Sequence, residues 1–184
     1  ITITDAFNLN TATGDTGVSV VLNADNININ AALTADNAGS VTMTANAAGS
    51  NQAGTGSIIF GGAGSISSAA GNIQLNVTTG GTGAITNAVA ATTGTGNITL
   101  SNLSSGGITI LSLNANAGAN DVTVTTGGTV LQSGTITADT LTLNGGGTFN
   151  LGSQNNAVTT LDVDDAAMGG DFSFRDDSGF AMTG

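Results

Sequence analysis

Aspartate is the only residue in this 184-residue chain that belongs to the usual general acids and bases, and its carboxylates are the only ones available as hard metal ligands. Histidine, cysteine, lysine and glutamate do not occur, and the twelve aspartates face a single cation, Arg175. General acid–base and nucleophilic catalysis draw mainly on the residue types that are missing. The composition therefore predicts a protein that is not an enzyme and that needs no cofactor.

The aspartates gather near the C-terminal end of the sequence, where their oxygens could serve calcium. The candidates are Asp162, Asp164, Asp165, Asp171, Asp176 and Asp177. Alternation along "TLDVDD" would put the first two on one outward strand face. The spacing matches neither an EF-hand loop nor a nonapeptide calcium roll. Calcium binding is therefore one hypothesis, and a solvated acidic edge that keeps the protein soluble is the other.

Two interleaved series of apolar residues must position any such site. The first runs at intervals of 25, 24, 19 and 20 residues: Ile73, Ile98, Val122, Leu141, Leu161. The second runs at 23, 22, 19 and 23 residues: Ile85, Ile108, Val130, Phe149, Phe172. A drifting period of this length is typical of solenoid repeats.

Each repeat contains short segments that alternate apolar and polar residues, as strands do. Examples are "SVTMT" at 40–44, "NITLS" at 97–101, "DVTVT" at 121–125, "DTLTL" at 139–143 and "TFNL" at 148–151. Glycine-rich segments separate them, and we expect these glycines to supply positive φ angles at tight bends. No segment carries a convincing helical period.

Stacked coils with one apolar face each would bury a continuous column of Ile, Val and Leu. The sequence therefore predicts an all-β fold, a single-stranded, right-handed parallel β-helix of about seven to eight coils. The expected coils are 1–24, 25–56, 57–83, 84–107, 108–128, 129–147, 148–170 and 171–184, with a bulging loop near 46–54 in the long second coil. A sandwich of antiparallel hairpins is the rival architecture.

The segments "GNIQL" at 71–75 and "GNITL" at 96–100 are nearly identical, and stacking of the coils explains this similarity. We expect Asn72 and Asn97 to stand at equivalent corners. There asparagine tolerates the left-handed conformation, and its amide can bond to the coil above or below.

Composition and charge exclude several partners. A net charge of −11 repels nucleic acid and anionic lipid surfaces. From these residues we expect neither a membrane-spanning segment nor a signal peptide, because no long apolar run and no basic start followed by an apolar stretch occurs. The absence of cysteine excludes disulfides and suits a chain exported while unfolded.

A family resemblance follows from longer segments. "DNININAALTADNAGSVTMTA" at 25–45 and "GTITADTLTL" at 134–143 resemble the passenger domains of filamentous-haemagglutinin-like and autotransporter-type bacterial exoproteins. The C-terminal segment 151–184 is similar to a unit of long β-strand-repeat surface proteins of Gram-negative bacteria. The resemblance implies a right-handed β-helix at the bacterial cell surface, serving as an adhesin, a surface fibre or a biofilm component. Its partners would be neighbouring coils, further copies of the chain, or a cell-surface receptor.

Threonine pairs suggest a different function. T-x-T occurs at Thr2/Thr4, Thr42/Thr44, Thr123/Thr125, Thr135/Thr137 and Thr140/Thr142. Outward rows of threonine would be similar to the flat arrays of ice-binding proteins. Threonine is also a favoured strand residue, and by sequence the pairs do not recur once per coil at one phase. Ice binding is therefore kept as an alternative to the structural fibre.

Overall fold

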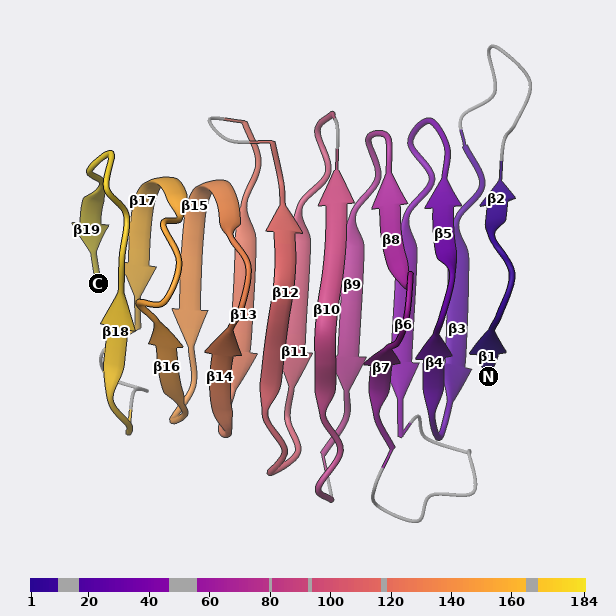
Figure 1. Cartoon of the computed structure of the whole chain (residues 1–184), viewed down its shortest axis with the longest axis horizontal. Coiled ribbons are helices and arrows are strands. Elements are labelled where there is room, and N and C mark those ends of the chain that lie inside the picture. Colours follow the sequence, from indigo (N-terminus) through magenta and orange to yellow (C-terminus); the bar gives the residue numbers. More distant parts are fainter. Residues whose placement is uncertain (10–16, 47–55, 80, 93, 117–118, 165–168) are drawn as a thin grey trace.

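The chain winds into a parallel β-solenoid of about seven turns (Figure 1). The computed structural model describes residues 1–9, 17–46, 56–79, 81–92, 94–116, 119–164 and 169–184. Over these residues there are nineteen strands and no helix. Every strand pair in the described ranges is parallel, which confirms the β-helix and excludes the antiparallel sandwich.

The pairings divide the solenoid into three faces. The first face contains β1 (Thr2–Ile3), β4 (Ile27–Ile29), β7 (Ile58–Phe60), the starts of β10 (Ile85–Thr92) and β12 (Ile108–Asn114), β14 (Thr129–Gln132), β16 (Thr148–Leu151) and β18 (Phe172–Phe174). The second contains β2 (Phe7–Leu9), β5 (Ala32–Ala35), β8 (Ser65–Ser68), the ends of β10 and β12, and the starts of β15 (Ile136–Asn144) and β17 (Ala157–Val163).

The third face is the most regular. It contains β3 (Val20–Ala24), β6 (Val41–Ala45), β9 (Ile73–Val77), β11 (Ile98–Asn102), β13 (Val122–Thr126), the ends of β15 and β17, and β19 (Ala181–Thr183). Its pairings run without a register shift, whereas β10 and β12 contain irregularities.

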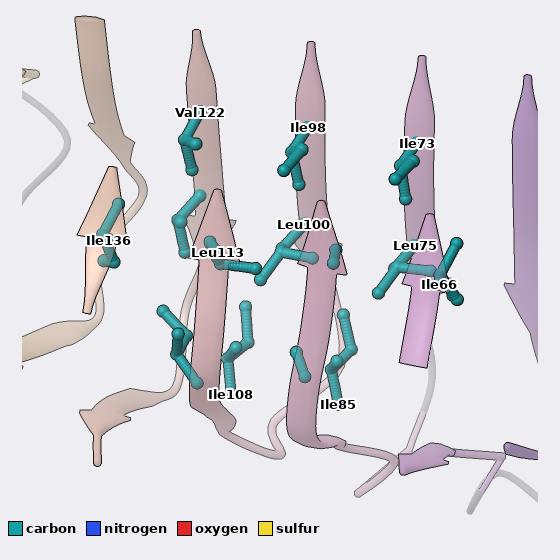
Figure 2. Packing of buried hydrophobic residues seen from close by; sticks show 14 of the residues in the cluster. Ile66, Ile73, Leu75, Ile85, Ile98, Leu100, Ile108, Leu113, Val122 and Ile136 are labelled. Carbon is teal, nitrogen blue, oxygen red and sulfur yellow. The ribbon is translucent and has the colours of Figure 1, made fainter. Parts of the chain in front are cut away.

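Both apolar series predicted from the sequence are confirmed as files of stacked residues. Ile73 pairs with Ile98, and Ile98 pairs with Val122, on the third face. Ile85 pairs with Ile108 on the first. Figure 2 shows these side chains side by side on successive strands. The sequence series fall on two faces only, so the second face is an addition from the structure.

The core is one continuous column inside these faces. Most inward aliphatic residues from β4 to β16 have no exposed surface. Fully burying such a side chain contributes about 1.5 to 3 kcal/mol. Phe60 and Phe149 lie in this column, but Phe7, at the N-terminal coil, is 48% exposed. The column therefore opens at the coils that have a neighbour on one side only.

A column of glycines brings successive coils together where the third face turns into the first. A Cβ atom on Gly83, Gly106 or Gly128 would lie 1.9, 2.0 or 2.3 Å from the carbonyl oxygen of the glycine one coil earlier. None of these three glycines has a positive φ. Gly145, in contrast, has a φ of 97°. The expectation that glycine supplies a positive φ holds at Gly81 and Gly145 but not at Gly83, Gly106 and Gly128. What the column requires is the absence of a side chain.

A ladder of side-chain acceptors stands at the corner before the third face. The Oδ1 atom of Asn72 accepts the backbone N–H of Asn97 at 2.9 Å, and Oδ1 of Asn97 accepts that of Asp121 at 3.0 Å. Asp121 accepts the N–H of Thr140 at 3.2 Å, and Ser40 accepts that of Asn72 at 3.2 Å. The expected bonding between coils is confirmed, although the donor is a backbone N–H.

The left-handed part of that expectation is wrong. Neither Asn72 nor Asn97 has a positive φ; the described asparagines that do are Asn37, Asn46, Asn87 and Asn116. Each ladder side chain instead accepts a hydrogen bond from a backbone N–H of the next coil, near the start of a strand. Leaving such an N–H group without an acceptor is unfavourable.

The bulging loop expected near 46–54 lies, apart from Asn46, outside the described residues. Asn46 itself ends the preceding segment in the left-handed region, with φ of 54°. Its side-chain Nδ2 donates to the carbonyl of Thr79 at 3.2 Å, which ties this corner to the next coil.

Candidate functional site

The outward side chains of the third face form two straight files across five consecutive coils. The Thr99 file pairs in register from β6 to β15: Thr42, Gln74, Thr99, Thr123, Thr142. The Ser101 file runs beside it: Thr44, Asn76, Ser101, Thr125, Asn144. The threonine pairs at 42/44 and 123/125 therefore share one face and one phase, but the coils between them carry other polar residues, so T-x-T does not recur once per coil.

Sequence reasoning missed these files because it searched only for threonine. Gln74, Asn76, Ser101 and Asn144 occupy the equivalent places in the other coils. The signal was available: the two files are the residues one and three places after each member of the first apolar series. An outward position tolerates any small polar side chain, so its residue type varies more than that of the inward partner.

The inward residues of the same strands hold these files in place. Ile98 and Leu100 flank Thr99 along β11, and both are fully buried. Val122 and Val124 do the same for Thr123 on β13. Threonine is also restricted at χ1 by its branched Cβ. The core beneath the strands therefore holds the backbone that carries these hydroxyl groups, and their side chains have few rotamers.

The files are polar but uncharged. Across the coils from β6 to the end of β15 both files contain only threonine, serine, asparagine and glutamine, and the first charged residue of the Thr99 file is Asp162 on β17. Asp121 lies at the adjoining corner, with its carboxylate bonded to the N–H of Thr140. Within the described residues, the hydroxyls of Thr99 and Thr123 have no hydrogen-bond partner in the protein. Each can both donate and accept.

The calcium candidates are spread over different faces. Asp162 points outward from the third face and accepts the hydroxyl of Thr183 at 3.1 Å. Asp164 follows the end of β17, and Asp171 precedes β18 on the first face. Asp165 lies outside the described residues.

Asp176 and Asp177 occupy the turn after β18 and are engaged by protein groups. Asp176 Oδ2 accepts the N–H of Val158 at 2.8 Å, and its Oδ1 accepts the N–H of Ser178 at 2.9 Å. Arg175 forms a bidentate pair with Asp177, with Nε and Nη2 at 2.9 and 2.6 Å from the two carboxylate oxygens. Arg175 is therefore the local charge partner of Asp177.

These contacts shift the pKa values of the turn. Partial burial raises the pKa of Asp176, but hydrogen bonds from the Ser178 hydroxyl and from the N–H groups of Val158, Ser178 and Gly179 outweigh it, so the pKa lies below its usual value. The hydrogen bond from Arg175 lowers the pKa of Asp177. The same hydrogen bond raises the pKa of Arg175.

No group of three or more Asp side chains capable of holding a metal ion is found among the described residues. Calcium binding therefore stays a prediction, without a cluster in the described ranges that supports it. The same part of the chain contains no helix long and apolar enough to cross a membrane.

Cavities lie away from the two files. One of about 340 Å³ opens where the core column meets the first coil, between Ile3, Phe7 and Leu22. Another of about 400 Å³ lies between β17 and the turn that contains Phe180. Phe180 packs edge-on against Phe174, with ring centroids 5.0 Å apart. Neither cavity is lined by a cluster of titratable groups.

Comparison of the chain with protein-family models, curated proteins and solved structures finds no significant match.

Proposed function

We propose that this chain is a stiff, non-catalytic segment of an extracellular bacterial surface fibre or adhesin, serving as a stalk in adhesion or biofilm formation. The observation that supports it best is the uninterrupted ladder: the coils from β4 to β17 pair with a coil on each side, around one apolar column. A molecule built this way resists bending and local opening, because each coil is held by both neighbours.

The composition of the described surface supports the same proposal. From β6 to the end of β15 the outward positions of the third face are polar and uncharged, and the chain contains no His, Cys, Lys or Glu. The side-chain ladder and the core column hold successive coils, and the chain has no cysteine that could form a disulfide. Such a segment could pass through an export pathway unfolded and fold afterwards.

We further propose that the open edges of the first and last coils meet β-strands. β1, β2 and β3 pair only with the second coil, and β18 and β19 only with the seventh, within the described chain. Open edges of this kind favour strand addition. Their partners would be neighbouring coils of a longer chain or a second copy stacked head to tail, which is the type of contact that builds filaments.

Surface display tests the stalk function directly. The chain would be placed between an outer-membrane anchor and an epitope tag, with a glycine–serine linker of equal length as the matched control. We expect the tag to stay attached under a protease dose that releases it from the linker. Failure of the chain to reach the surface, or release as fast as from the linker, would contradict the proposal.

A further inference from the structure

The two files of the third face form a lattice of hydrogen-bonding groups in continuous register. Neighbouring strands lie about 4.8 Å apart and residues two places apart along a strand about 6.7 Å apart. The Thr99 file and the Ser101 file therefore repeat in two dimensions with these spacings over five coils. The oxygen atoms on a prism face of hexagonal ice repeat at similar separations in both directions.

Charge distinguishes this face from the molecule as a whole. The chain carries −11, yet neither file has a charged side chain between β6 and the end of β15. A neutral face on an acidic protein fits an uncharged ligand, because a charged one would lose its hydration without gaining an ion pair. Ice is uncharged and so satisfies this condition. The threonine and serine hydroxyls of the face can each donate or accept a hydrogen bond to a water molecule of the ice lattice.

The face is also fixed before any ligand arrives. The inward neighbours of both files are fully buried at Met43, Leu75, Leu100, Val124 and Leu143. A backbone held in place in this way loses little conformational entropy on binding, so many weak contacts can add up. The unpartnered hydroxyls of Thr99 and Thr123 give up no protein hydrogen bond when they bind water.

From this geometry we propose that the third face binds ice, with the Thr99 file and the Ser101 file as the contact lattice. The neutral alternative, an extended polysaccharide, is less well matched. Sugar recognition relies largely on stacking against aromatic rings. Both files lack aromatic residues throughout their five coils. This inference is independent of the stalk function, since an inert stalk needs no ordered hydroxyl lattice.

The decisive measurement is the thermal hysteresis of the purified full chain in a nanolitre osmometer, together with its uptake into a growing ice shell. Thr99→Lys places a charged, longer side chain at the centre of the array. Thr137→Lys is the matched control, because Thr137 is an equally half-buried outward residue on β15 but belongs to the second face. Thr123→Lys repeats the test one coil further along, should Thr99→Lys fail to fold.

We expect hysteresis and ice uptake in the native chain, loss of both to the level of buffer in Thr99→Lys or Thr123→Lys, and full retention in Thr137→Lys. All variants should keep the native β circular dichroism and melting temperature. Absence of hysteresis and ice uptake in the folded native chain would overturn the proposal, as would equal loss in Thr137→Lys. Retention on insoluble cellulose that Thr99→Lys abolishes, without hysteresis, would assign the face to a neutral glycan instead. None of these outcomes alters the protease test of the stalk.

Discussion

Asn102 is the polar residue on which the corner between the third and first faces depends. Its side chain is fully buried at the end of β11. Its Nδ2 lies 3.1, 2.9 and 3.1 Å from the carbonyl oxygens of Gly83, Gly106 and Gly107. Its Oδ1 accepts the N–H and the hydroxyl of Ser104 at 3.1 and 2.7 Å. A buried group that satisfies so many backbone partners is costly to remove.

Replacing Asn102 by alanine should lower the free energy of unfolding by about 3 kcal/mol, because buried carbonyls lose their donor. The ladder residue Asn97 is exposed, so water can replace its side chain, and Asn97→Ala should cost about 1 kcal/mol or less. Urea denaturation of the two variants measures both values. Equal losses would show that burial does not decide the importance of these asparagines.

Asp176 should make the last coil sensitive to acid. Its folded pKa is depressed, so its contribution to stability is present above the unfolded pKa of about 3.9 and is lost as the pH falls through the folded value. We expect the melting temperature of the native chain to fall as the pH drops below about 4. Asp176→Asn should be less stable at pH 7 and show a smaller fall.

The control for this titration is Asp171→Asn in the same coil, which removes one carboxylate without breaking the bond to Val158. It should leave the acid response in place. An unchanged acid response in Asp176→Asn would mean that other carboxylates govern it. The charged neighbours that could affect the titration of Asp176 are Arg175 and Asp177, and their opposite charges offset each other in the ion pair.

Among the elements, the glycine column sets how closely successive coils approach. Gly106→Ala would place a Cβ atom 2.0 Å from the carbonyl oxygen of Gly83, and both groups belong to backbones held by ladders. We expect a loss of about 3 kcal/mol or more, by the mechanism of overpacking. Thermal unfolding followed by circular dichroism provides the measurement.

Gly127 supplies the matched control one coil later. No atom lies within 4 Å of where its Cβ would be, and its φ is not positive. Gly127→Ala should therefore be neutral or slightly stabilising, because alanine reduces the freedom of the unfolded chain. If both substitutions cost the same, close approach is not the reason for the glycines.

The strands illustrate how far a sequence alone can lead. "TFNL" at 148–151 coincides with β16, and the two apolar series predict the register of two faces. The second face escapes prediction because its strands are short and carry small residues, as in β5 and β8, or continue from the first face without a break, as in β10 and β12.

The candidate site shows a different limit. The outward files follow from the same register as the inward series, so their alignment could be derived from the sequence once that register was known. The glycine contacts could not, because a close approach of two backbones depends on how the coils superimpose in space. Alternating apolar and polar residues predict a strand. Which residues of the neighbouring coil lie opposite that strand follows only from the pairing of strands in space.

For the whole molecule, the repeat predicts that coils add independently. Ile108 pairs with Val130, so duplicating residues 108–129 inserts one coil of 22 residues in register. We expect a rod longer by about 4.8 Å with an unchanged or higher melting temperature. Small-angle X-ray scattering and circular dichroism measure the two quantities. Loss of cooperative unfolding would show that coils are not interchangeable units.

Metal removal tests the calcium hypothesis at the same scale. The described candidates other than Asp164 and Asp171 accept hydrogen bonds or ion pairs through their carboxylates. We therefore expect the melting temperature in EDTA to equal that in millimolar calcium. A lower value in EDTA, restored by calcium and not by magnesium, would instead support a calcium site.

Among the described residues one ion pair is found, between Arg175 and Asp177, and the sequence as a whole carries a net charge of −11. Molecules lying flank to flank therefore repel one another in dilute buffer. Dissolved salt shortens the reach of that repulsion to about 10 Å at 0.1 M and about 3 Å at 1 M. Lateral bundling is consequently governed by ionic strength, so rods that stay separate in fresh water can gather side by side in brine.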